Sequence, residues 1–241
     1  MNDNLATPAS ALAVSAHPDD SEFGCGATLA RWAAAGCTVH LAVCTDGSKG
    51  SWDPQIDTAE LVVRRQAEQR EAARRLGAGG EVVFLGYTDG ELEANLGARA
   101  LLASWIRRLR PAAVLGHDPW KRYRIHPDHR QAGLLVTEAV VAARDPHFFA
   151  EQNLPAHRPA HLLLFEADEP DHYEDASGWI DAKVAALEAH ESQLESTMGI
   201  EADDDGSQRE AFRQRIRREA AEAGEAAGLA QAEAFKLSSD L

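Results

Sequence analysis

The sequence ALAVSAHPDD, residues 11–20, joins a short apolar run to a cluster of side chains of the types that can bind metals. Residues 11–15 are almost entirely apolar, which is typical of a central parallel strand covered on both faces. The run stops at HPDD, residues 17–20, whose imidazole and carboxylates are candidate ligands for a divalent metal. One such motif also suits an ordinary turn, because Pro fixes a bend and Asp accepts backbone hydrogen bonds there.

A second motif of similar composition follows much later in the chain. HPDH occupies residues 126–129 and comes after the apolar run at 112–115. Histidine and carboxylate ligands that converge from two loops suit a hydrolytic zinc site, which usually has three protein ligands and one position for water. Two matched motifs, each after a strand-like run, therefore favour a metal site over two unrelated turns.

Apolar runs alternate with helical patterns along most of the chain. The patterns predict strands at residues 11–15, 38–45, 81–85, 112–115 and 162–165, and helices at 57–76, 97–110, 128–144, 179–194 and 208–227. This alternation is typical of βαβ units with a mostly parallel sheet. We therefore predict a single Rossmann-like α/β domain, whose five strands have the order 3-2-1-4-5 and are flanked by helices.

This order makes strands one and four neighbours at the point where the strand order reverses. Ligands of open parallel sheets bind in the crevice outside the strand ends at that point. Because the two motifs follow these two strands, we expect them to meet. Residues 1–200 are predicted to form the functional domain, and residues 201–241 a helical C-terminal extension packed on it.

The composition excludes some classes of partner. The chain has 241 residues and a net charge of −15, from 24 basic and 39 acidic side chains, which argues against binding to nucleic acids or anionic membranes. No apolar stretch approaches the roughly 20 residues of a membrane-spanning helix, and residues 1–4 lack the positive charge of a signal peptide. Cys25, Cys37 and Cys44 form no metal or disulfide pattern, so we expect buried thiols and a cytoplasmic location.

The spacing of the two motifs suggests how His17, Asp19, Asp20 and His129 divide the roles of metal ligand and base. His17 and Asp20 can hold one ion across the bend, and His129 can reach it from the first turn of its helix. Zinc would lower the pKa of a bound water to about 7. Asp19, which is next to these ligands, is placed to take a proton from that water.

The rest of the second motif completes a hydrolytic set. His126 can stabilise an oxyanion or protonate a leaving group, with Asp128 holding its ring. The predicted reaction is metal-assisted attack of water on a carbonyl. Two His and one carboxylate are also the ligands of non-haem iron oxygenases, so an oxygenase, or Fe²⁺ as the native metal of a hydrolase, stays an alternative.

Both motifs and their surroundings resemble the LmbE/PIG-L family of zinc-dependent N-deacetylases. The resemblance covers roughly the first 195 residues and includes AHPDD at 16–20, EFGCGAT at 22–28, TDG at 45–47, FLGYTDG at 84–90, HPDH at 126–129 and HESQ at 190–193. The paired His-Pro-Asp motifs are its most specific part. The family removes acetyl groups from N-acetylglucosamine-type sugars, including precursors of bacterial thiols and of glycosylphosphatidylinositol anchors.

The resemblance implies roles for individual residues. It implies zinc ligands at His17, Asp20 and His129, and a general base at Asp19. It implies that His126 binds the oxyanion with Asp128 as its partner, and that Arg65 and Asp89 contact sugar hydroxyls. Some relatives carry, two residues before the second motif, a Tyr that helps to bind the oxyanion. Arg124 stands at that position here, and the neighbouring Tyr123 is the candidate substitute.

The resemblance also implies a substrate, a small N-acetylglucosamine-type sugar or glycoside that loses its N-acetyl group. An amidase acting on a thiol-sugar conjugate uses the same chemistry and is the nearest alternative. A noncatalytic metal- or sugar-binding protein is a further one, whereas a dinucleotide site at Gly24-x-Gly26 lacks its third glycine. Trp52 and Trp120 lie in loops on the side of the site and suit either substrate recognition or a contact in a homo-oligomer.

Overall fold

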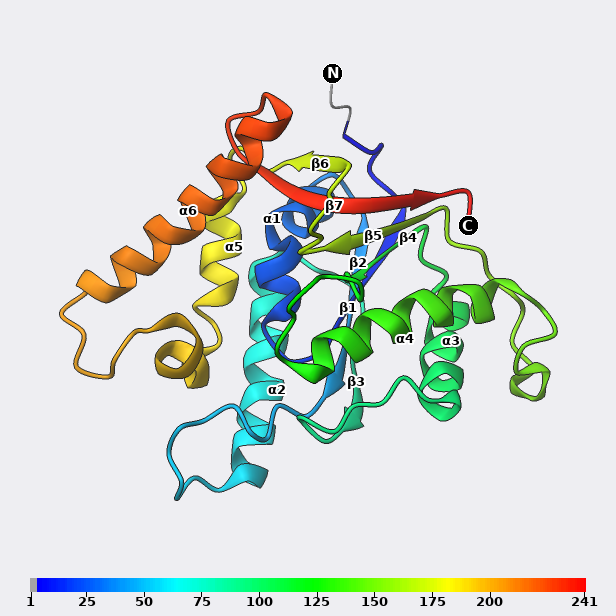
Figure 1. The fold of residues 1–241 in the computed structure, drawn as a ribbon, viewed down its shortest axis with the longest axis horizontal. Helices are drawn as coiled ribbons and strands as arrows, with labels where there is room; N and C mark the ends of the chain where they lie inside the picture. Colours follow the sequence, from blue (N-terminus) through cyan, green and yellow to red (C-terminus); the bar gives the residue numbers. More distant parts are fainter. Residues whose placement is uncertain (1–3) are drawn as a thin grey trace.

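A seven-stranded sheet forms the centre of the molecule (Figure 1). The structure is a computed structural model and describes residues 4–241. The strands are β1 (Ser10–Ser15), β2 (Thr38–Thr45), β3 (Val82–Tyr87), β4 (Ala113–His117), β5 (His161–Phe165), β6 (His172–Asp175) and β7 (Ala232–Ser239), in the order β3-β2-β1-β4-β5-β7-β6. The first five strands pair in parallel, and β7 lies antiparallel between β5 and β6.

Helices cover both faces of the sheet (Figure 1). They are α1 (Asp20–Ala34), α2 (Thr58–Arg75), α3 (Leu96–Leu109), α4 (Pro127–Arg144), α5 (Ile180–Leu187) and α6 (Ser207–Ala227), with short turns η1 (Ala150–Gln152), η2 (Glu191–Gln193) and η3 (Leu194–Met198). Along β1, Leu12 and Val14 belong to the core under α3 and α4, whereas Ala11 and Ala13 belong to the core under α1 and α2. This alternation explains why β1 is apolar throughout, since both of its faces are buried.

The starts of two helices carry the two motifs. Asp19 precedes α1 and Asp20 is the first residue of that helix. His126 precedes α4, and Pro127 occupies the first helical position, where its fixed φ suits the helix and its missing N–H costs no hydrogen bond. Each motif is thus held between the end of a buried strand and the beginning of a helix.

The predicted α/β class, the mostly parallel sheet and the order of the first five strands are confirmed. The strand number is wrong, because the sheet has seven strands and not five. The C-terminal extension is also not purely helical: α6 is followed by β7, which pairs with β5 on one side and with β6 on the other. Because β7 completes the same sheet, we propose that residues 201–241 fold together with residues 1–200.

The remaining predictions from the sequence concern membrane-spanning segments, the cysteines and the N-terminus. Within residues 4–241, no helix combines the length and the apolar character that crossing a bilayer requires. Cys25, Cys37 and Cys44 are free and buried, as predicted. Most of the segment on which the signal-peptide expectation rests, residues 1–3, lies outside the described residues.

Candidate metal and catalytic centre

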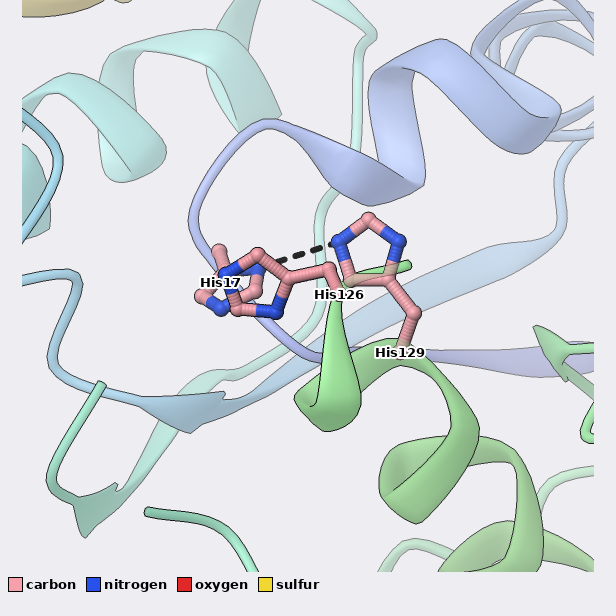
Figure 2. A group of neighbouring side chains, drawn as sticks. All are labelled: His17, His126 and His129. Carbon is pink, nitrogen blue, oxygen red and sulfur yellow. Dashed lines mark hydrogen bonds between the residues drawn. The ribbon is translucent and has the colours of Figure 1, made fainter. Parts of the chain in front are cut away.

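The two motifs meet at the C-terminal edge of the sheet (Figure 2). β1 and β4 are hydrogen-bonded neighbours, so the loops that follow them emerge side by side. His17 comes from the loop after β1, whereas His126 and His129 come from the beginning of α4. The ring centroids of His17 and His126 are 4.5 Å apart. The strand order therefore brings the motifs together as the topology predicted.

The three predicted metal ligands surround one point. His17 Nδ1 lies 3.2 Å from His129 Nε2 and 3.3 Å from Asp20 Oδ2, and His129 Nε2 lies 3.3 Å from Asp20 Oδ1. Ligand atoms that are each about 2.0–2.2 Å from a tetrahedral zinc ion are themselves about 3.3–3.6 Å apart. The donor types and their spacing therefore fit one zinc ion, and His126 and His117 also have ring nitrogens within reach of these ligand atoms.

The far nitrogen of the His17 ring faces two carboxylates. His17 Nε2 lies 3.1 Å from Asp128 Oδ2 and 3.3 Å from Asp89 Oδ1. Burial opposes protonation, but hydrogen bonds to Asp128, Asp20 and Asp89 outweigh it and raise the pKa of His17 to about 12. A carboxylate on the far nitrogen is typical of a metal-binding His, because it fixes the tautomer and orients the ring. These carboxylates make the centre strongly favourable for a cation.

Asp128 does not have the contact that the sequence suggested. Its carboxylate is fully buried, accepts the N–H groups of Gly90 at 2.6 Å and Leu92 at 3.2 Å, and contacts His17. Within the described part of the chain, no hydrogen bond joins Asp128 to His126. Asp128 points inward from the first turn of α4, whereas His126, just outside that helix, is exposed. Asp128 therefore holds the ring of His17 and not that of His126.

The environment of His129 is less typical of a metal ligand. Burial lowers the pKa of His129 to about 4, against the pull of Asp20 and with help from nearby His117 and His17, so the ring is neutral. Its Nδ1, however, lies 2.6 Å from Arg124 Nη1. Arginine only donates, so Nδ1 accepts, whereas a metal on Nε2 would leave Nδ1 as the donor. Arg124 therefore opposes the tautomer that ligation requires.

His117 and Glu166 join the same group, although neither stands in a motif that predicts a role for it. His117 Nε2 lies 3.3 Å from Asp20 Oδ2, and His117 Nδ1 lies 3.2 Å from Glu166 Oε2. Glu166 also pairs with Arg124. His117 ends β4 and Glu166 directly follows β5, so the rule that sites form at strand ends marks both positions.

Asp19 lies beside the ligands in an unusual backbone conformation. Its φ of 100° is uncommon for a residue with a side chain. Burial raises the pKa of Asp19 to about 6, although the guanidinium of Arg65, with Nη2 3.5 Å from Asp19 Oδ2, opposes the shift. A carboxylate whose pKa lies near neutrality, next to the ligand positions, has the properties of a general base.

A cavity of about 340 Å³ opens in front of these side chains. Small-molecule sites typically measure about 300–1,000 Å³. The cavity is lined by His17, Asp19, Asp20, Lys49, Gly50, Arg65, Asp89, Gly90, His126, His129, Gln193 and Thr197. Lys49, Gln193 and Thr197 were not predicted as site residues; they come from the loop after β2 and from the η2–η3 segment. The many charged and polar side chains in this lining suit a polar small molecule.

Of the three residues predicted to contact the substrate, two line the cavity and one does not. Arg65 and Asp89 line the cavity. Arg65 is nevertheless occupied by the protein itself, since it donates to the carbonyl oxygens of Pro18 at 2.7 Å and Gly47 at 3.0 Å. Tyr123 is 94% exposed and does not line the cavity, so the structure does not bring it to the site.

Comparison with known proteins identifies a family and several relatives of this chain. Residues 12–140 match the family described as PIG-L, GlcNAc-PI de-N-acetylase. The chain is 34% identical over 186 residues to a diacetylchitobiose deacetylase of Thermococcus kodakarensis, covering 76% of this chain and 69% of that protein. It is 32% identical over 230 residues to a 1D-myo-inositol 2-acetamido-2-deoxy-alpha-D-glucopyranoside deacetylase of Mycobacteroides abscessus, covering 76% and 81%.

The fold is shared with a solved relative. The structure of N,N'-diacetylchitobiose deacetylase from Pyrococcus horikoshii, in complex with an inhibitor, superimposes with a TM-score of 0.85. The match covers 96% of this chain and 84% of that one at 29% sequence identity. The likeness therefore extends into the C-terminal segment, residues 201–241.

Proposed function

Because this chain belongs to the PIG-L/LmbE family and is a de-N-acetylase, we propose that it removes the N-acetyl group from an N-acetylglucosamine unit of a small glycoside. Family membership decides against an oxygenase and against a noncatalytic binding protein. Diacetylchitobiose and an N-acetylglucosaminyl inositol are the substrates named for two relatives, and both contain such a unit. Both are neutral sugars, which suits a chain with a net charge of −15.

The observation that carries the proposal is the convergence of His17 Nδ1, His129 Nε2 and the Asp20 carboxylate next to Asp19, on the wall of one cavity. These three side chains would hold one metal ion, for which we propose zinc, with Fe²⁺ as the alternative. The ion would supply Lewis acidity and a lowered pKa for water. Asp128 and Asp89 orient the His17 ring from behind.

The other residues of the cavity would divide proton transfer and binding. Asp19 takes the proton that water loses on attacking the amide carbonyl, and can return it to the departing nitrogen. His126 lines the cavity, and burial, with the adjacent His17, lowers its pKa so that the ring is neutral near pH 7. We propose that it donates a hydrogen bond to the oxygen that becomes negative. Asp89 and Lys49 line the cavity and are our candidates for contacts to sugar hydroxyls.

An acetate-release screen tests the function. The panel comprises N-acetylglucosamine, its simple glycosides, diacetylchitobiose, N-acetylglucosaminyl inositol and a thiol conjugate of that sugar. Asp19→Asn protein is the blank, and Asp203→Asn, which changes an exposed carboxylate far along the chain, is the matched control. Acetate from a glycoside is the expected result. Release of an acylated thiol conjugate alone favours the amidase, and metal-loaded protein that is silent on every compound contradicts the sugar substrate.

A further inference from the structure

Behind Asp19 lies a chain of buried polar side chains that does not reach the cavity. The Asp19 N–H donates to Gln69 Oε1 at 3.0 Å, and Gln69 Nε2 donates to Glu22 Oε1 at 2.7 Å. Gln69 is 1% exposed and Glu22 is fully buried. Neither residue lines the cavity, so neither can touch a substrate.

The network fixes the orientation of the Gln69 amide. Its oxygen faces a main-chain N–H, and its nitrogen faces a carboxylate that only accepts. Turning the amide over would place N–H against N–H and oxygen against oxygen. Glu22 therefore determines which end of Gln69 meets Asp19.

Gln69 shares its target with Arg65. The Pro18 carbonyl and the Asp19 N–H belong to one peptide unit, and Arg65 Nη2 binds the carbonyl at 2.7 Å while Gln69 binds the N–H. Arg65 and Gln69 are four residues apart on α2, so their side chains lie on the same face of that helix. Two neighbouring side chains thus hold both polar groups of the peptide from one helix.

This peptide is the one that sets the direction of the Asp19 side chain. With φ at 100°, Asp19 occupies a region that non-glycine residues rarely adopt, and such a conformation persists only when its surroundings hold it. A small misplacement of a reacting group can cost up to about 10²-fold in rate. The clamp on the peptide is therefore also a constraint on the carboxylate.

We propose that Gln69, oriented by Glu22, is a positioning residue that clamps the Pro18–Asp19 peptide and thereby aims the Asp19 carboxylate at the metal centre. The part that concerns catalysis rests on the proposed function, in which Asp19 is the base. The clamp itself is a property of the fold and can be measured without a substrate.

A reciprocal exchange of side chains tests the catalytic part. In Gln69→Glu, two carboxylates face each other, so the clamp should open and kcat should fall about tenfold or more, with KM within about twofold and the metal content unchanged. Adding Glu22→Gln restores a donor opposite an acceptor, and the double variant should regain most of the lost kcat. Full kcat in Gln69→Glu, or a double variant no better than the single one, would overturn the proposal.

Hydrogen exchange tests the clamp independently of activity. Gln69→Met keeps the size of the side chain but removes the acceptor, so amide exchange in a peptide covering residues 16–23 should accelerate at least about tenfold. Gln66→Met on the same helix is the matched control and should leave that exchange unchanged. Unchanged exchange in Gln69→Met would refute the clamp. If wild-type protein releases no acetate while this exchange still accelerates, the proposed function fails and the clamp stands.

Discussion

Two buried charged clusters are attached to α1, and they differ in balance and in access. The cluster at the start of the helix contains His17, Asp20, Asp89, Asp128 and His129 and opens to the cavity. The second cluster lies beyond the kink at Cys25, where φ is −150°. There Glu233 of β7 accepts the N–H groups of Ala27 and Thr28 at 3.1 and 2.8 Å, and Lys183 Nζ at 2.7 Å.

The difference shows how a metal centre can be distinguished from a structural ion pair. Around Lys183, one cation meets one carboxylate, and the same ammonium also donates to the Phe23 carbonyl at 2.6 Å. Around His17, the carboxylates of Asp20, Asp89 and Asp128 face one imidazole, so negative charge is in excess there even when the ring is protonated. A closed and balanced cluster leaves no charge for a bound ion to neutralise, whereas an open cluster with excess acceptors is suited to bind a cation.

The largest expected effect follows removal of a ligand from the open cluster. His129→Ala should lose the metal and at least about 10³-fold in kcat/KM, because a bound ion contributes several kcal/mol of charge stabilisation. Elemental analysis of purified protein and acetate release measure the two losses. His147→Ala, which removes an exposed imidazole, should change neither. Full metal occupancy in His129→Ala would show that the third ligand is a different residue.

Breaking the closed cluster should affect stability and not chemistry. Lys183→Met leaves the Glu233 carboxylate buried without its cation and should lower the free energy of unfolding by about 3–5 kcal/mol. Lys236→Met removes an equally short but exposed pair with Asp171 and should cost less than about 1 kcal/mol. Denaturant unfolding measures both. A Lys183→Met protein that binds less metal while folded would contradict the separation of the two clusters.

Within the open cluster, the ligands and the base should be separable. Asp19→Asn keeps the shape of the side chain but cannot accept the proton, so kcat should fall on the order of 10²-fold or more while one equivalent of metal remains. Acetate release and elemental analysis on the same samples test this. Loss of the metal together with activity would place Asp19 among the ligands.

Whether these clusters could be predicted from the sequence depended on how far apart along the chain their contacting residues lie. His17, Asp20 and His129 stand in compact motifs at strand ends, so residue type and strand order sufficed to bring them together. Gln69 and Glu233 have no local signature, because a Gln inside a helix or a Glu near the C-terminus is usually solvated. Their roles come from contacts across 47 to 206 positions of sequence, which only the folded chain defines.

The extra strands escaped prediction for a related reason. β6 has only four residues, His172–Asp175, and most of them are polar. β7, AEAFKLSS, follows a long helix and has no strongly apolar run. Both segments become strands because each pairs with a strand already in place, and strand preference depends on such context more than helix preference does.

The pH dependence of activity should carry the signature of the buried base. Asp19 must be ionised to accept a proton, and burial raises its pKa to about 6. Activity should therefore be constant above that pH and fall about tenfold for each pH unit below it, as for any single base that must lose its proton. A pH profile of kcat/KM between pH 4.5 and 8 measures this limb. A profile that stays flat down to pH 4.5 would show that no group with a raised pKa acts as the base.

The smallest effect concerns a contact to the open cluster that does not suit a metal site, between Arg124 and His129. Arg124 donates to His129 Nδ1, whereas a ligand bound through Nε2 needs an acceptor at that place. In Arg124→Gln the amide oxygen can accept the ring N–H, so the metal dissociation constant should fall about threefold to tenfold in competition with a chelator. Arg122, in the same loop, pairs with Asp168, so Arg122→Gln should have no such effect. Weaker metal binding in Arg124→Gln would mean that Arg124 supports the ligand, through its pair with Glu166, more than it competes with the metal for the tautomer of His129.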